Sequence, residues 1–382
     1  MASLVSGNPT TSRDVLELTA YPAGFGHLFI AAMMAIDLAR QKGLRFVLED
    51  NYWDGQPSRR PDNYSSWAWS LSPVFRRASE VRKETRRWTD ASMSAIRYSD
   101  MLRKECSVAG SAPVWYRVDV ASNTACRGAA PRTRVGWFCT ELLPGVLERS
   151  LASFMHSEAL RLPPSVGPNA AIQTRSSGRV RAVWHIRTGD YHTRVSERAM
   201  LALSRLLVQS FPRRGIEHYV LTYNSSGLKN RVPTFMNMVK RNPESRVSSD
   251  KETVLDDLAE MANAEVLVGT GSSLSIAASA FAPVGQLHLP FPPQVIPLFG
   301  VHPGVPTISR LPGYRANYIS RNTVPISAAG EPFSGGYRNK LHLMAAAIDN
   351  GGRAGLDVAS LAFEDWLTNN TSTSIRGKAC VS

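Results

Sequence analysis

Strand-like and helix-like apolar segments alternate along residues 181–289, and this alternation constrains the fold more than any other feature. RAVWHIR at 181–187 is typical of a strand, Ser196 can cap a helix that continues to Phe211, and HYVLTY at 218–223 is typical of a second strand. The pattern continues with helices at 233–241, 252–263 and 273–281 and strands at 265–269 and 285–289. Strands and helices that alternate across short connections predict a doubly wound α/β domain with a parallel sheet.

A similar unit lies near the N-terminus. After a loose leader over 1–14, residues 15–20 predict a strand, and the apolar run from Leu28 to Leu38 predicts a helix that ends at Lys42-Gly43. Residues 46–48 then predict a buried strand, which completes one right-handed βαβ unit. Residues 51–150 are rich in Trp, Arg and Pro, and we expect them to form helices and loops built onto this unit.

The length of the chain, 382 residues with 43% hydrophobic residues, predicts two domains rather than one. A stretch rich in Pro, Gly and Ser at 161–179 separates the two α/β patterns. We expect an N-terminal α/β domain with irregular insertions over 1–165, a second α/β domain over 175–335, and C-terminal helices over 336–382 that pack back across both. The predicted fold class is α/β, with two Rossmann-like doubly wound domains facing a cleft.

Charge and cysteine content restrict the partners and the kind of site. The formal net charge of +13 favours an anionic partner, such as nucleic acid, an acidic membrane or a nucleotide-activated substrate. Four widely spaced cysteines predict neither a zinc site nor a dense disulfide framework. We see no apolar run long enough to span a bilayer and no signal peptide. Two localisations therefore stay open: the cytoplasm, or the Golgi if the chain is an enzyme separated from its membrane anchor.

The segment HIRTGDY follows the first strand of the second domain and carries groups suited to an anion. His185 and Arg187 share one face of the strand, because side chains alternate with a period of two. Arg187 is a candidate for a forked contact to a diphosphate, and pairing with Asp190 is the alternative. His185 is about equally suited to a ligand contact and to a place in the core.

The segment from Thr270 to Ser273 connects a buried strand to a helix of small residues. The amide groups at the start of that helix can bind an anion, and the hydroxyls of Ser272 and Ser273 can add donors, although N-capping alone explains one of them. Upstream, Asp257 lies on the preceding helix with Asp256 and Glu260. Solvated helix charge is the default interpretation of this cluster, and a carboxylate that recognises a nucleobase is the alternative.

Gly24-Phe25-Gly26-His27 forms the turn after the first strand, where glycines allow a ligand to approach the backbone closely. The full GxGxxG fingerprint and the Walker A motif are both absent from the sequence, which disfavours oxidoreductases and P-loop NTPases. The sequence also lacks a GxSxG elbow, an HExxH motif and a pair of carboxylates of the DxD type after a strand. A hydrolase of those classes and a sugar-nucleotide site that depends on a divalent metal therefore have little support.

These motifs together resemble a known superfamily. HIRTGDY resembles the His-x-Arg-x-x-Asp peptide of GDP-fucose-dependent fucosyltransferases of the GT-B fold, and LVGTGSSLSIAASAF is similar to a later motif of that superfamily. YPAGFGHLFIAAMMAIDLARQKGLRFVLEDNYWDG, followed by SPVFRRASE, looks most like the α1,6-fucosyltransferase and nodulation-fucosyltransferase branch, whereas HIRTGDY is closer to the α1,2-fucosyltransferases. Thr188, Tyr223-Asn224 and Leu274 depart from the pattern of that branch.

The resemblance implies an inverting transfer of L-fucose from GDP-fucose to a hydroxyl of a glycan or glycoconjugate, with no cofactor and no required metal. It implies that Arg187 contacts the β-phosphate and that His185 and Asp257 hold guanine, Asp257 being preferred to Asp256 because its distance to Ser273 matches the family. The other implied donor contacts are Gly24, Gly26, Trp53, Thr270, Ser272 and Ser273.

Glycosyl transfer also needs a general base to deprotonate the acceptor hydroxyl. The candidates are Asp190, His192, Glu197 and His27, and the sequence favours none of them. Two other classes of protein remain open: a GT-B relative that binds a nucleotide or glycan without catalysis, and a nucleic-acid-binding protein. The second is prompted by the charge and by the Trp- and Arg-rich region 53–104, but it has no recognised binding module, so we expect no nucleic-acid partner.

Overall fold

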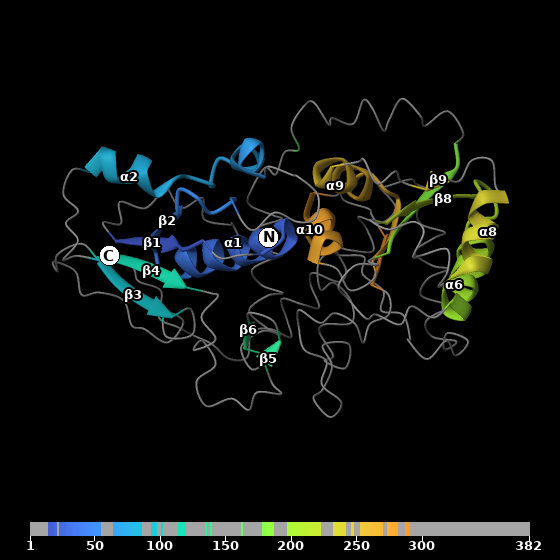
Figure 1. Cartoon of the computed structure of the whole chain (residues 1–382), viewed down its shortest axis with the longest axis horizontal. Coiled ribbons are helices and arrows are strands. Elements are labelled where there is room, and N and C mark those ends of the chain that lie inside the picture. The colour runs from blue at the N-terminus through green and yellow to red at the C-terminus, as the bar shows by residue number, and fades with distance from the viewer. Residues whose placement is uncertain are drawn as a thin grey trace, which may run out of the picture.

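The structure is a computed structural model (Figure 1). It describes residues 14–20, 23–54, 64–85, 93–97, 101, 114–119, 134–135, 138–139, 162, 178–186, 197–222, 232–241, 246–247, 253–269, 273–281 and 287–290. The leader expected over 1–14, apart from its last residue, the C-terminal helices expected over 336–382 and the expected domain bounds all lie outside these residues.

The first sheet is parallel throughout, with the strand order β2-β1-β4-β3. Its strands are β1 (Val15–Leu18), β2 (Arg45–Leu48), β3 (Met93–Arg97) and β4 (Trp115–Asp119). Strands β1 and β2 confirm the predicted βαβ unit. Strands β3 and β4 correct the expectation of helices and loops over 51–150, because Arg117 of β4 is ion-paired within the sheet and obscures the apolar pattern.

The rest of the described part of the first domain consists of short elements. The 3₁₀ helices η1 (Tyr64–Ser66) and η2 (Ala68–Leu71) precede the helix α2 (Ala78–Thr85), which fits the expected helices. The strands β5 (Arg134–Val135) and β6 (Phe138–Cys139) form a separate antiparallel pair.

Helix α1 (Phe25–Gln41) connects β1 to β2 and is the most apolar helix of the first domain. Its end follows from Gly43, which has φ 64° and so adopts the left-handed conformation that glycine tolerates. The N–H of Gly43 bonds to the carbonyl of Arg40 and the N–H of Leu44 to that of Ala39, which makes a Schellman motif. Among the described residues, α1 and the other helices are all too short or too polar to span a membrane.

The second sheet is also parallel, with the strand order β11-β10-β7-β8-β9. Its strands are β7 (Val180–His185), β8 (Ile216–Leu221), β9 (Arg246–Val247), β10 (Val266–Gly269) and β11 (Leu287–Pro290). Its helices are α6 (Glu197–Ser210), α8 (Pro233–Arg241), α9 (Val254–Ala262) and α10 (Ser273–Phe281). All the helices and strands predicted over 181–289 are confirmed, and β9 is additional, so the fold is α/β with two Rossmann-like parallel sheets.

Strand β7 divides its side chains between two helical layers. Ala182 and Trp184 of β7 pack with residues of α6 and α8 in one apolar cluster. Val183 points to the other face and packs in a second cluster with residues of α9 and α10. This alternation, expected for a strand with helices on both faces, puts His185 on the same face as Val183.

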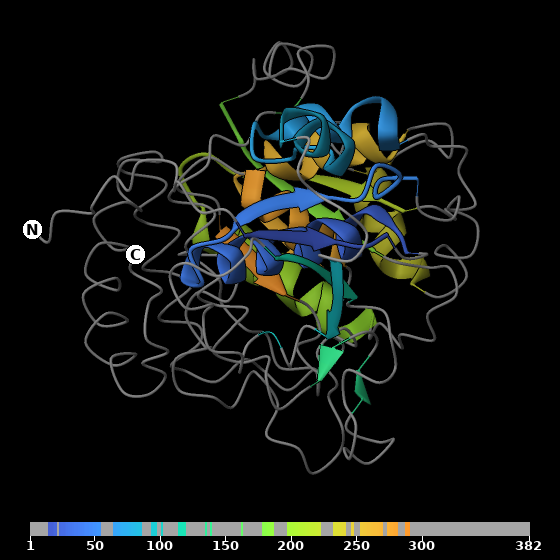
Figure 2. The same ribbon diagram turned by 90° about the vertical axis from the view of Figure 1, so that its left-hand side faces the viewer.

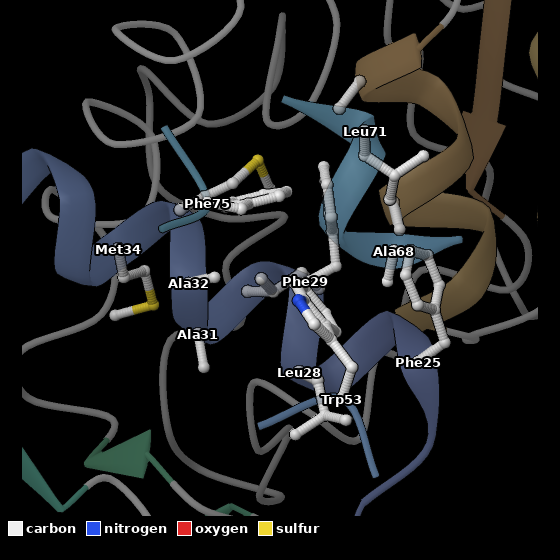
Figure 3. Close-up of a cluster of buried hydrophobic side chains, with 14 of the residues drawn as sticks. Phe25, Leu28, Phe29, Ala31, Ala32, Met34, Trp53, Ala68, Leu71 and Phe75 are labelled. Atoms are coloured by element: carbon white, nitrogen blue, oxygen red, sulfur yellow. The ribbon is translucent and has the colours of Figure 1, made fainter. Parts of the chain in front are cut away.

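The second cluster continues into the first domain, because α1 packs against α10. The rings of Phe29 on α1 and Phe281 at the end of α10 have their centroids 5.0 Å apart. Figure 1 shows the two helices next to each other between the two sheets, and Figure 2 shows the same ribbon with the first sheet facing the viewer. Figure 3 shows the first-domain side of this core, with Phe25, Phe29 and Trp53 close together around α1. The two sheets therefore share one apolar core.

Candidate functional site

The candidate site lies where β7 and β10 end, in the middle of the second sheet. From β7 the chain adds β8 and β9 on one side, and it then returns to add β10 and β11 on the other side. The point between β7 and β10 is thus the topological switch point, where doubly wound sheets bind ligands beyond the carboxyl ends of their strands. His185 is in register with Gly269, so the two strands end at the same level.

Several predicted site residues follow directly from these strand ends. Ser273 is the first residue of α10, four positions after Gly269. The predictions for Arg187, Asp190, His192, Thr270 and Ser272 lie outside the described residues. The strands that lead to Arg187 and to Ser272, β7 and β10, are neighbours in the sheet, as a shared phosphate site would require.

His185 is the last residue of β7 and is almost fully buried, with 8% of its surface exposed. It lies on the sheet face that α9 and α10 cover, as the packing of Val183 shows. A polar side chain at this depth needs a hydrogen-bonding environment, which the end of the strand can share with a ligand. Its position suits both of the interpretations that the sequence left open.

The two neighbouring carboxylates on α9 have different environments. Asp256 belongs to a capping box: its Oδ2 accepts the N–H of Thr253 (2.9 Å), and its own N–H bonds to the Thr253 hydroxyl (3.2 Å). Asp257 is one position further, on the buried face of the helix, and is only 4% exposed. The interpretation as solvated helix charge is therefore wrong for Asp257, and Asp256 is occupied by its cap.

The glycine turn of the first domain is open on its outer side. Gly24 is exposed, precedes α1 and has φ −71°, a value that any residue adopts. A Cβ atom placed on Gly24 would meet no atom within 4 Å. Neither the backbone conformation nor the packing therefore requires glycine here, whereas close approach of a ligand would. The predicted turn is corrected beyond Gly24, because Phe25, Gly26 and His27 already form the first turn of α1, where Gly26 is buried and His27 is half-buried.

The predicted closure of this turn over a diphosphate stays a prediction. The contact between Phe29 and Phe281 joins the first turns of α1 to the last residue of α10. Ser273 lies at the other end of that nine-residue helix, about 12 Å away along its axis.

Trp53 is fully buried in an aromatic cluster. Its ring contacts Phe25 (5.8 Å between centroids), Tyr52 (4.9 Å) and Phe75 (5.3 Å). Trp53 thus packs against the first turn of α1, as Figure 3 shows. The expected contact of Trp53 with a nucleoside stays a prediction, and the structure shows a packing role.

Glu197, one of the candidate bases, has a structural partner. It is the first residue of α6, and its Oε1 accepts the N–H of Phe235 (2.9 Å) in the first turn of α8. The carboxylate thus stabilises the N-terminus of a neighbouring helix. Its role as a general base, like that of His27, stays a prediction.

Glu49 is a residue near the glycine turn that the sequence analysis missed. Its Oε2 accepts the N–H of Ala20 (2.7 Å), and its Oε1 is 2.6 Å from the guanidinium of Arg117. It therefore fixes the backbone that leads from β1 towards Gly24. The signal in the sequence was its position directly after a buried strand, at the edge where the turn also lies.

Protein-family models and curated protein sequences give no significant match to the chain. Solved structures give distant similarities. Fucosyltransferase NodZ from Bradyrhizobium is 10% identical over 71% of this chain and 94% of that one, with a TM-score of 0.40. ADP-heptose LPS heptosyltransferase II from E. coli is 12% identical over 87% of this chain and 98% of that one, with a TM-score of 0.47. A family 9 glycosyl transferase from Veillonella parvula is 9% identical over 91% of this chain and 98% of that one, with a TM-score of 0.40. Similarity at this level transfers neither a substrate nor a residue role to this chain.

Proposed function

We propose that the chain is a glycosyltransferase whose donor is a nucleoside diphosphate sugar, and that this donor is GDP-fucose. One observation carries the proposal: a buried carboxylate, Asp257, lies on the helix that packs against β7, the strand that ends at the switch point with His185. The capping box of α9 is formed by Asp256 and Thr253. A buried carboxylate at a ligand-binding edge suits guanine, which presents two N–H donors on one edge.

The chemistry follows from the residues that the motifs place at this edge. Departure of GDP leaves growing negative charge on the diphosphate while the sugar acquires oxocarbenium character. Arg187 and the amide end of α10 would stabilise that charge without a metal, as preorganised donors do. Removal of the Arg187 guanidinium should slow transfer by about 10²–10³-fold, the usual cost of losing one such donor.

Nucleotide titration tests the binding half of the proposal. Calorimetry with GDP, ADP and UDP should show that GDP binds most tightly to the wild type. Asp257→Asn should weaken GDP binding about 10- to 100-fold, because it loses a charged hydrogen-bond acceptor. Asp256→Asn is the matched control: it alters the helix cap next door and should leave GDP affinity within about twofold.

Turnover tests the catalytic half. Hydrolysis of GDP-fucose should be measured for the wild type and for Arg187→Ala, with and without EDTA. Equal rates for the two proteins would remove Arg187 from catalysis, and binding without any turnover would indicate a nucleotide-binding relative that has lost activity. A wild-type protein that binds none of the three nucleotides would refute the proposal, and loss of turnover in EDTA would refute the metal-independent mechanism.

A further inference from the structure

Arg77 lies at the same edge of the first sheet as the glycine turn. It forms a parallel bridge with Leu48, the last residue of β2, and the N–H of Leu48 bonds to the carbonyl of Arg76 (2.9 Å). Strand β2 is next to β1, which leads to Gly24. Because Leu48 ends β2 and the strands are parallel, Arg77 lies level with the carboxyl ends of the strands. Ligands of such sheets bind at this edge.

Arg77 differs from the other arginines around this sheet in what its guanidinium contacts. Arg45 and Arg76 both pair with Glu84, and Arg82 and Arg117 both pair with Glu17. The Arg77 guanidinium instead lies over the ring of Trp69, 4.7 Å from its centroid, and the side chain is exposed. Within the described ranges no carboxylate is within ion-pair distance of it.

The carboxylates closest to Arg77 in the chain have other partners. Glu80 accepts the backbone N–H of Arg77 (3.4 Å), and Asp50 accepts that of Ser79 (3.0 Å). Glu49 holds Ala20 and Arg117. Arg77 is therefore a cation held in place by an aromatic ring while the neighbouring acids are engaged elsewhere.

Trp69 adds a rigid surface and an unused donor. Its ring packs edge-on against the buried Trp53, with 6.3 Å between centroids and 85° between planes. Its indole Nε1 is buried and, among the residues that the structure describes, has no hydrogen-bond acceptor.

We propose that Arg77 and Trp69 form an acceptor subsite for a sugar that carries a carboxylate or a phosphate. The ring covers one face of the guanidinium and leaves its N–H edges free for two oxygens of one anionic group. The fixed guanidinium loses little conformational entropy on binding, because stacking already orients it. This inference rests on the proposed function, since an acceptor has meaning only for a transferase.

Glucuronate, glucose 6-phosphate and glucose are the probes for this subsite, and the indole ¹H–¹⁵N signal of Trp69 is the readout, assigned with Trp69→Phe. Both anionic sugars should shift the signal saturably, and glucose should bind at least tenfold more weakly. Arg77→Gln should weaken the anionic sugars at least tenfold, and Arg77→Lys should restore only part of the loss. Arg76→Gln is the matched control, because this neighbour pairs with Glu84, and it should leave their affinity within about twofold.

GDP binding, measured on the same samples, separates this inference from the proposed function. Normal GDP binding without a Trp69 response, or an equal response to glucose, would overturn the subsite and leave the transferase proposal standing. A response to the anionic sugars in a protein that binds no nucleotide would overturn its role as an acceptor site. Arg77→Lys also guards against misfolding of Arg77→Gln, since it keeps the stacked cation.

Discussion

Glu17 of the first sheet and His218 of the second are both polar side chains on strand faces that helices cover. They are 1% and 4% exposed. Each accepts a hydrogen bond from a tryptophan indole on the adjacent strand, Glu17 from Trp115 and His218 from Trp184. Beyond that shared contact, the two groups are stabilised in opposite electrostatic ways.

Glu17 is charged and is stabilised by arginines that reach in from the surface. Arg82 lies 3.0 Å and Arg117 3.6 Å from its carboxylate, and these side chains are 40% and 38% exposed. His218 is stabilised as a neutral ring: Nδ1 accepts from Trp184 (3.0 Å), and Nε2 lies 3.2 Å from the Ser204 hydroxyl. The comparison shows that the buried carboxylate of Glu17 is balanced by counter-ions that still contact water, whereas the buried ring of His218 is kept neutral.

The largest expected effect is that of removing the charged group. Glu17→Ala should lower the free energy of unfolding by about 3–5 kcal/mol, because it breaks a buried ion pair and leaves the Trp115 indole without its acceptor. Urea denaturation measures the change. Glu84→Ala is the control, since its pairs with Arg45 and Arg76 are exposed and should contribute far less to stability. Equal losses of stability in the two variants would show that the buried ion pair contributes no more than the exposed one.

The second effect depends on pH and belongs to His218. Burial lowers the pKa of His218 from 6.5 to about 4, because desolvation penalises the charged form of the ring. Since the folded pKa is the lower one, the neutral ring is stabilising above pH 6.5, and that contribution is lost as the pH falls from 6.5 through 4. The free energy of unfolding should fall by on the order of 3 kcal/mol across this window.

His218→Asn should remove most of that slope while lowering stability at pH 7.5, because asparagine accepts from Trp184 but does not titrate. Denaturation curves at pH 7.5, 6, 5 and 4 measure both effects. An unchanged slope in the variant would show that another group controls the acid sensitivity.

A smaller effect should come from salt. Because Arg82 and Arg117 are partly exposed, 1 M NaCl should weaken their pairing with Glu17 by about 0.5–1 kcal/mol relative to 0.1 M. The His218 hydrogen bonds are neutral and should not respond. The salt dependence of wild type minus that of Glu17→Gln isolates the effect, and no difference would show that the network is not screened.

The smallest effect on stability should be that of Gly24→Ala, which tests whether the first domain shares in donor binding. Alanine fits the backbone and meets no atom within 4 Å, so stability should stay the same or rise by about 0.5 kcal/mol. GDP affinity should nevertheless fall, because the added methyl group blocks close approach of the diphosphate. Unchanged affinity would place the glycine turn outside the donor site.

Sequence patterns predicted the second domain well because its strands are buried on both faces and its helices begin and end at clear signals. The helix over 233–241 begins at Pro233, and Thr253 caps α9. The first domain was predicted less completely. Arg117 places a charge in the middle of a central strand. The strand tolerates this charge because Arg117 pairs with Glu17 and Glu49, which are far away in the sequence.

The candidate site was predicted to a similar extent. Two acidic residues in a row predicted a carboxylate on α9, but which of them is buried depends on the phase of the helix relative to the sheet. The hydrogen bonds that Thr253 donates to the Asp256 carboxylate fix Asp256 outward as a cap, and Asp257 is thereby turned inward. Contacts between distant segments, such as that of Glu49 with Arg117, leave no local pattern and could not be predicted.

The packing of α1 against α10 bears on any attempt to express half of this molecule. Phe29 is fully buried, and it contacts a helix of the other domain. A fragment that ends in the stretch rich in Pro, Gly and Ser at 161–179 would keep α1 and lose α10. The complementary fragment would keep α10 and lose α1. Each would display a bare apolar helix face and self-associate, whereas both fragments produced together should reassemble.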